Sequence, residues 1–369
     1  MILSDLNLRT GDVSATGGAS LQAADGQINV GLDITGQAGN LSRFSAASGQ
    51  PLAGSADLGI TGQIEALSAA FDLAITGTGQ DLQFADALPV ELFAGETQLA
   101  ANVIRNESGL NLDSLSLENA ELSLTGTAAL SSGDTTATTR FQLQNVGLFT
   151  DILTGPVTID ADVARTGTEP FDVAATLTGP NEIQAEIDGQ FDAETTDFDV
   201  TLEASARGLN IGNGIPPQLL SGLTEVSATA TRVGDTVTLS DLSVRNPELT
   251  LTGDASMRPD TSRADVQARL ANVGLFTDAL SGPVTADAAI TRNGSDPWRV
   301  DADLGGPAGM RAAVNGQVGL PNGAVDLSAT GQAPLALANR YIAPRSIQGT
   351  LGFDLALRGQ PGLGAHFGI

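Results

Sequence analysis

Apolar and polar residues alternate along most of the chain with a period of two. Val157, Ile159 and Val163 fall on one face of an extended segment, whereas Asp160 and Asp162 fall on the other, and residues 171–177, 183–187 and 198–204 repeat the pattern. Such alternation predicts strands with one sheltered and one wet face. Each run of about 8–10 residues would span roughly 26–34 Å. Parallel strands read as continuous apolar runs, so the pattern favours an antiparallel, one-sided sheet.

The chain also repeats itself. Residues 141–180 and 268–307 align without gaps at an offset of 127 residues, with 23 of 40 positions identical. Short segments of helical character that end in glycine recur at a finer spacing of 60–67 residues. They end at Gly95, Gly155, Gly222, Gly282 and Gly349. Repeats at a regular spacing indicate an array in which neighbouring units bury each other's faces.

We therefore expect an all-β fold: an elongated, repetitive antiparallel sheet curled into a hydrophobic groove, with short helices or loops crossing between units. Residues 1–369 would form one continuous array. Its approximate units are 1–54, 55–95, 96–155, 156–222, 223–282 and 283–349, and 350–369 would begin a truncated unit. A second interpretation, which periodicity does not separate from the first, is that the apolar residues pack together in a closed core.

The candidate groove-lining residues are the apolar members of the alternating runs. They are Leu115, Leu117, Leu122, Leu124, Val157, Ile159, Val163, Phe171, Val173, Ile183, Ile187, Val200, Leu202, Leu242, Val244, Leu249, Leu251, Val284, Ile290, Trp298 and Val300.

The composition excludes several kinds of catalytic and metal-binding site. The chain has no Cys, one His (His366), and 17 basic residues, all Arg, against 43 acidic ones, for a net charge of −26. Thiolate chemistry, His-pair zinc sites and lysine-dependent catalysis are thereby excluded. The negative charge repels phosphate backbones and so disfavours nucleic-acid binding. We expect no catalytic residues, no metal site and no cofactor.

Three features are typical of one known family. They are the one-sided strands GLNLDSLSLENAELSLTGTAAL (109–130), the recurrent P-x-x-L-x-G or L-F-T-D-x-L-x-G segments, and the tail PLALANRYIAPRSIQGTLGFDLALRGQPGL (334–363). In these the chain resembles the TamB family, within the AsmA-like superfamily of bridge-like lipid-transfer proteins. The similarity extends over essentially the whole chain.

The resemblance implies a periplasmic β-taco in the cell envelope of a Gram-negative bacterium. The full-length protein would be anchored in the inner membrane and would meet a TamA-type outer-membrane barrel protein. It would carry phospholipid acyl chains along the groove and support outer-membrane assembly and protein secretion. On this basis we expect the chain to be an internal slice of a longer protein, with membrane contact through parts outside it. A structural or adhesive β-repeat protein is the alternative, and a carboxylate hydrolase on a β-solenoid is a third.

Some residues have two interpretations. Phe149, Leu153, Phe276 and Leu280, in the glycine-ended segments, either cap or gate the groove or simply fill the ends of units. The pairs Asp160/Asp162 and Asp301/Asp303 are either Ca²⁺ ligands or part of a solvated face. The recurrent Arg105/Arg232 and Arg165/Arg292 either hold phosphate head groups at the groove rim or serve turns and ion pairs. Trp298 occupies the position in the repeat that corresponds to Phe171, so we expect it to be a groove or core residue.

Overall fold

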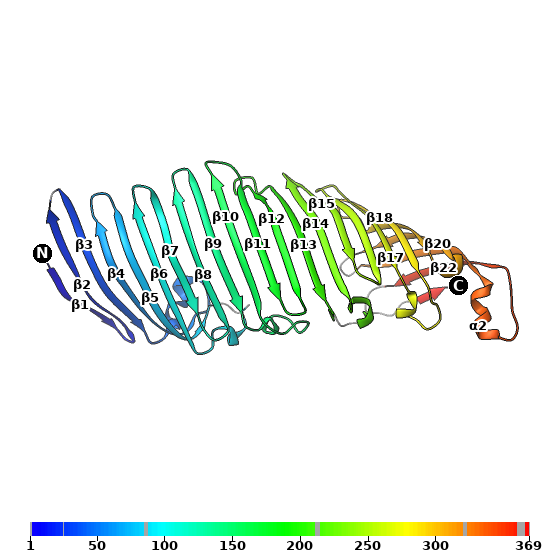
Figure 1. The fold of residues 1–369 in the computed structure, drawn as a ribbon, viewed down its shortest axis with the longest axis horizontal. Coiled ribbons are helices and arrows are strands. Elements are labelled where there is room, and N and C mark those ends of the chain that lie inside the picture. The colour runs from blue at the N-terminus through cyan, green and yellow to red at the C-terminus, as the bar shows by residue number, and fades with distance from the viewer. Residues whose placement is uncertain are drawn as a thin grey trace. The chain divides into compact units, whose positions relative to one another are not determined.

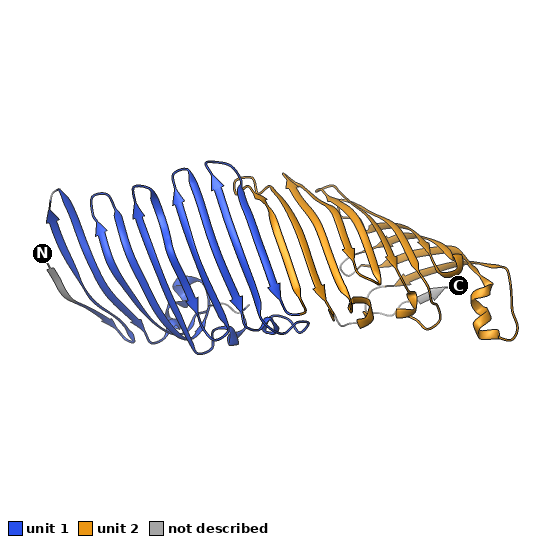
Figure 2. Cartoon of the chain, viewed as in Figure 1, with its two compact units in different colours: residues 1–180 blue, residues 181–369 orange. Residues whose placement is uncertain are grey.

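The computed structural model describes residues 2–24, 26–84, 88–210, 215–319, 323–359 and 366–368. The chain forms two compact units, residues 1–180 (unit 1) and residues 181–369 (unit 2), which are coloured separately in Figure 2. Each unit consists of antiparallel strands joined by short connections, so the prediction of an all-β, antiparallel fold is confirmed.

In unit 1 every strand pairs with the next one in the chain, as Figure 1 shows. The strands are β1 (Ile2–Thr10), β2 (Val13–Ala24), β3 (Gln27–Ala38), β4 (Ala53–Glu65), β5 (Ala70–Gln83), β6 (Glu96–Asn106), β7 (Gly109–Glu118), β8 (Leu122–Ser131), β9 (Asp134–Leu143), β10 (Val157–Thr166) and β11 (Phe171–Gly179). The helical segments are η1 (Leu41–Phe44), α1 (Ser45–Ser48), η2 (Val90–Phe93) and η3 (Val146–Leu148).

Unit 2 has the same sequential pairing. Its strands are β12 (Ile183–Phe191), β13 (Phe198–Arg207), β14 (Leu223–Val233), β15 (Thr236–Arg245), β16 (Leu249–Met257), β17 (Thr261–Leu270), β18 (Val284–Asn293), β19 (Trp298–Gly305), β20 (Arg311–Val318), β21 (Val325–Pro334), β22 (Thr350–Gly359) and β23 (His366–Gly368). Its helical segments are η4 (Pro217–Leu220), η5 (Val273–Leu275), η6 (Pro307–Gly309), η7 (Leu335–Ala338) and α2 (Asn339–Ile342). Within the described residues, no pairing joins the first and last strands of either unit, so each sheet is open.

The 127-residue repeat corresponds to eight strands. Strands β4 to β13 have their counterparts in β12 to β21; for example, β8 matches β16 and β10 matches β18. The repeated sequence therefore encodes repeated local geometry.

Recurrent asparagines explain part of this geometry. The Asn119 Oδ1 atom accepts hydrogen bonds from the backbone N–H groups of Glu121 and Leu122, both at 2.8 Å. Its Nδ2 atom donates to the carbonyl oxygen of Leu92, at 3.0 Å. Asn246, 127 residues later, makes the same pair of Oδ1 contacts. An asparagine side chain that stands in for backbone partners fixes a tight turn, which is why the turn between β7 and β8 recurs between β15 and β16.

All connections from an odd-numbered to the next even-numbered strand lie at one edge of each sheet, because the strands alternate in direction. This edge carries the helical segments and is called the helical edge; in unit 1 it is the lower edge in Figure 1. The opposite edge carries short turns, such as those after β6 and β10, and is called the hairpin edge. The predicted glycine-ended segments are these short helical turns.

One face of each sheet collects the alternate apolar residues, and we call it the apolar face. In unit 1 a row across five strands holds Leu117, Leu124, Phe141, Ile159 and Leu177. In unit 2 a corresponding row holds Val244, Leu251, Ala268, Ala286 and Leu304. The opposite, polar face carries Ser, Thr, Asp, Gln and Arg residues, as the alternation predicts.

A β-bulge keeps β7 in register with this face. Leu112 and Leu115 are an odd number of residues apart, so a regular strand would point them to opposite faces. The pairing of β7 with β8 shifts between these two leucines, and both then lie on the apolar face. The same shift recurs in β15 between Leu239 and Leu242. An inserted residue of this kind also bends the strand.

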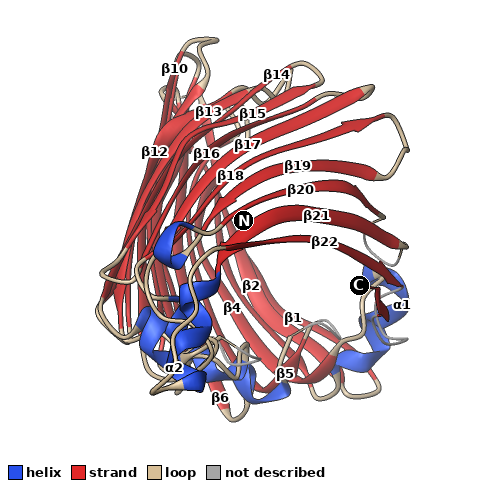
Figure 3. Ribbon diagram, turned by 90° about the vertical axis from the view of Figure 1, so that its right-hand side faces the viewer, coloured by secondary structure: helices blue, strands red, loops and turns tan. Residues whose placement is uncertain are grey.

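Glycines in the middle of strands mark places where two neighbouring backbones approach closely. Gly62 in β4 lies on the apolar face with φ +150°, and a Cβ atom there would clash with the backbone carbonyl oxygen of Asp72 in β5. The same close approach recurs at Gly189 and Gly316. Glycine permits two backbones to approach where a sheet bends. Strands β19 to β22 of unit 2 are visibly arched in Figure 3.

Candidate functional site

The candidate site is the apolar face itself. In unit 1 the strand register places nine of the predicted lining residues on this face, and in unit 2 it places the other twelve there. Those of unit 1 are Leu115, Leu117, Leu122, Leu124, Val157, Ile159, Val163, Phe171 and Val173. Those of unit 2 are Ile183, Ile187, Val200, Leu202, Leu242, Val244, Leu249, Leu251, Val284, Ile290, Trp298 and Val300.

Most of this face is half-exposed. Ile159, Val173, Leu202 and Ile290 all retain part of their surface in solvent. In the part of the chain that the structure describes, the buried apolar side chains are Leu92, Phe93, Leu122, Leu143, Ala206, Leu219 and Leu220. A closed two-layer core would bury the central rows. The described residues therefore form sheets whose apolar face has no second layer over its centre.

The buried cluster lies at the helical edge of unit 1. Leu92 and Phe93 of η2 pack with Leu122 and Leu143, and Leu122 is only 4% exposed. The ring of Phe84 meets that of Phe93 edge to face, with centroids 5.2 Å apart. Leu122 was predicted to line the groove, but its position beneath η2 leaves it almost no surface for a ligand.

The four helical segments η2 to η5 are of two kinds, which alternate along the chain. Leu219 and Leu220 of η4 are buried, like Leu92 and Phe93 of η2. Beside η3 and η5, in contrast, Phe149 is 51% and Phe276 53% exposed. The first kind covers the ends of the strands beside it. The second kind leaves its aromatic ring half-exposed, and a role in capping or gating the groove stays a prediction.

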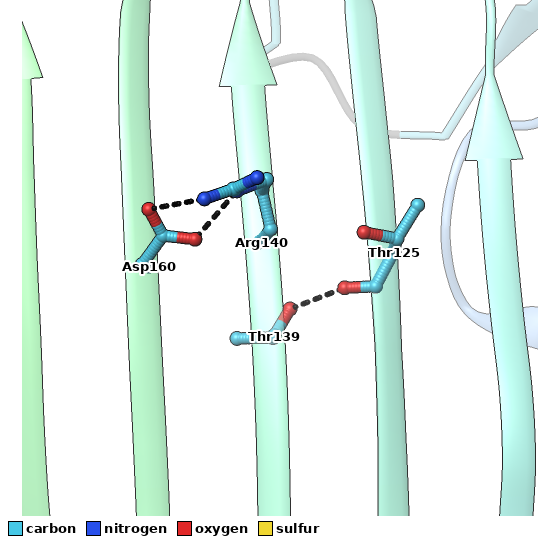
Figure 4. Close-up of polar contacts among 4 residues, drawn as sticks. All are labelled: Thr125, Thr139, Arg140 and Asp160. Carbon is cyan, nitrogen blue, oxygen red and sulfur yellow. Dashed lines mark hydrogen bonds and ion pairs between the residues drawn. The ribbon is translucent and has the colours of Figure 1, made fainter.

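The polar face of unit 1 holds a charged pair. The Arg140 Nε and Nη2 atoms donate to the two carboxylate oxygens of Asp160, at 2.6 and 3.1 Å (Figure 4). On the other face of the same strand, the Thr139 hydroxyl donates to the carbonyl oxygen of Thr125, at 3.2 Å. The hydrogen bonds from Arg140 keep the pKa of Asp160 below its usual value. Because Arg140 already occupies this carboxylate, Asp160 is a poor partner for Asp162 in a Ca²⁺ site.

Among the described residues, no group of three or more His, Asp or Glu side chains is arranged to hold a metal ion. An open hollow of about 520 Å³ lies beside Asp160 on the polar face, lined by residues that include Thr127, Thr138 and Asp162. Hydroxyl and carboxylate groups of this kind are those expected on a solvated face. His366 lies in β23, and its side chain falls outside the described part of the structure.

The recurrent arginines sit on the apolar face at the hairpin edge. The Arg165 guanidinium lies over the ring of Phe171, 4.5 Å from its centroid, and Arg292 lies over Trp298, at 5.5 Å. Trp298 therefore replaces Phe171 in the same contact. Sequence reasoning missed the aromatic partners of these arginines, although the 127-residue repeat held the signal.

Comparison with family models found no match, and comparisons with curated proteins and with solved structures found none either. Within the described ranges, every helix is too short to reach across a bilayer. The fold and the face together define a class, a repetitive all-β protein with an open antiparallel sheet and a half-exposed apolar surface.

Proposed function

We propose that the apolar face holds the acyl chains of phospholipids, and that the chain is a segment of a TamB-like, non-enzymatic lipid-carrying bridge in the periplasm. The observation that carries the proposal is the long apolar face with no second layer over its centre. Eleven strands at about 4.8 Å each, with an apolar band roughly 25 Å wide, amount to an area on the order of 1,000 Å² in unit 1. Soluble monomers rarely leave more than a few hundred Å² of apolar surface uncovered.

The energetics suit an acyl chain. Each methylene group removed from water contributes roughly 0.8 kcal/mol, and an extended sheet face offers many equivalent contacts. No single enclosed pocket is required, because head groups remain in water while chains lie on Leu, Val, Ile and Ala side chains. Repetition then supplies a series of similar weak sites, as movement along a surface requires.

The curvature supports a groove. Gly62, Gly189 and Gly316 lack side chains on the apolar side, where a Cβ atom would meet the backbone of the neighbouring strand. Glycine kinks and β-bulges are the positions at which sheets acquire curvature. We therefore propose that the apolar face is the inner face of a curled sheet.

The polar face argues against hydrolysis by paired carboxylates. A general acid needs a raised pKa, and Arg140 shifts the pKa of Asp160 in the opposite direction. We accordingly propose no catalytic role for these acids. Contact with a TamA-type barrel protein and a role in outer-membrane assembly follow from the family resemblance and remain part of the proposal.

A lipid-loading experiment tests this function. The purified chain is incubated with vesicles of phosphatidylethanolamine and phosphatidylglycerol and re-isolated, and bound lipid is counted by mass spectrometry. We expect several phospholipids per chain. Ala161→Asp, on the apolar face of β10, should lower this number, because a carboxylate beside an acyl chain loses its hydration.

Ala164→Asp is the matched control, since it makes the same change on the polar face of the same strand. It should leave the lipid count unchanged. An unmodified chain that carries no lipid would instead favour a structural or adhesive β-repeat protein.

A further inference from the structure

Arginine and an aromatic residue meet repeatedly at the hairpin edge of the apolar face. Arg165 lies over Phe171, and Arg292 lies over Trp298. Two more arginines face an aromatic residue across a strand pair: Arg105 is opposite Phe71, and Arg232 is opposite Phe198. Each arginine is the last apolar-face residue of its strand, just before a turn at the hairpin edge.

The two pairs of each unit are separated by the same interval. Arg105 is in β6 and Arg165 in β10 of unit 1, and Arg232 is in β14 and Arg292 in β18 of unit 2. Each interval is four strands, or about 19 Å at the usual strand separation. The sheet of each unit therefore presents two positive charges, four strands apart, along the hairpin rim of its apolar face, and we call these four residues the rim arginines.

These arginines are not taken up by carboxylates. In the described part of the chain, the ion pairs hold Arg43, Arg140, Arg207, Arg263 and Arg358, and the four rim arginines are not among them. The Arg232 Nε atom donates to the carbonyl oxygen of Gly234, and that of Arg292 to the carbonyl oxygen of Asp296, both at 3.1 Å. These bonds orient the guanidinium through one nitrogen and leave its terminal amino groups for another acceptor. In a chain with 43 acidic residues and only 17 basic ones, that is a distinctive arrangement.

We propose that each arginine–aromatic pair is a subsite for the phosphodiester group of a phospholipid whose acyl chains lie on the apolar face. The inference rests on the proposed lipid-carrying function and adds the residues that bind the phosphate group. A guanidinium binds phosphate through two parallel N–H···O bonds. The aromatic ring beside it suits the boundary between an apolar surface and water. Lipids without a phosphate would lie on the same face with no anchor at the rim.

The test compares two lipids with identical acyl chains, phosphatidylglycerol and diacylglycerol, in vesicles offered to the full chain. In one variant Arg105, Arg165, Arg232 and Arg292 are all changed to Gln. We expect its affinity for phosphatidylglycerol to fall by about tenfold or more at each subsite, because charge-assisted hydrogen bonds are lost. Diacylglycerol binding should stay the same.

The matched control changes four ion-paired arginines, Arg140, Arg207, Arg263 and Arg358, to Gln, which alters the net charge equally. It should bind both lipids like the unmodified chain. Changing the four rim arginines to Lys keeps the positive charge but removes the paired N–H donors of the guanidinium. This variant should therefore bind phosphatidylglycerol better than the Gln variant but less tightly than the unmodified chain. Thermal unfolding of every variant shows whether the fold is intact.

The outcomes separate the two proposals. If the rim variant binds both lipids normally, or loses both equally, the phosphate subsites are wrong while the lipid-carrying face stands. If the unmodified chain binds neither lipid, both proposals fail.

Discussion

Replacing Leu122 by alanine is expected to lower the free energy of unfolding by about 2–5 kcal/mol. Leu122 lies in the buried cluster with Leu92, Phe93 and Leu143, where η2 covers the end of the sheet. Removing its side chain leaves a cavity that η2 and the two strands fill only in part. Chemical denaturation of the chain, followed by circular dichroism, measures the change.

Leu130→Ala is the matched control. Leu130 lies on the same strand and the same face as Leu122, at the opposite edge, and is 47% exposed. Its substitution should change the stability by less than about 1 kcal/mol, because little packing is lost. Equal effects at the two positions would contradict the account in which η2 closes one edge and the rest of the face is open.

Gly62→Ala is the second substitution with a large expected effect. The added Cβ atom would meet the carbonyl oxygen of Asp72, and the φ of +150° is one that alanine rarely adopts. Clash and backbone strain together should destabilise the chain by about 1–3 kcal/mol. A lower thermal midpoint in calorimetry would report this loss. Bound lipid should also decrease if the bend shapes the groove.

Gly36→Ala provides the comparison for Gly62→Ala. Gly36 is also in a strand and on the apolar face, but a Cβ atom there would be 3.9 Å from its nearest neighbour, the carbonyl oxygen of Leu58. This alanine restricts the unfolded chain without strain, so it should be neutral or stabilise by up to about 1 kcal/mol. If Gly62→Ala and Gly36→Ala change the stability equally, the strand does not need a glycine at position 62.

The sequence predicted the strands and their faces because one variable, the period-two alternation, decides both. It also revealed the repeat, which the structure resolves as eight strands. It did not distinguish Leu122 from Leu124, since both have the same place in the alternation. Which of them is covered depends on the path of η2, a tertiary contact between residues about 30 positions apart.

Two other features could not be predicted from the alternation of apolar and polar residues. The bulge in β7 changes the phase between Leu112 and Leu115, so a simple count would have put them on opposite faces. The aromatic partner of Arg105 is Phe71, which is distant in sequence and becomes its neighbour only through the pairing of β5 with β6. The strand register determines both the faces of these leucines and the partner of Arg105. Register is a property of paired strands and not of one strand alone.

The central claim is that lipid lies on the apolar face and only there. The most direct measurement is a scan along β18, in which a photo-crosslinking amino acid replaces one residue at a time in protein loaded with phospholipid. Mass spectrometry then identifies each adduct. We expect lipid adducts at the apolar-face positions and none at the polar-face positions between them; the two sets are Ala286, Ala288 and Ile290, and Thr285, Asp287 and Ala289. Lipid captured equally on both faces, or only protein captured at the apolar-face positions, would contradict the account.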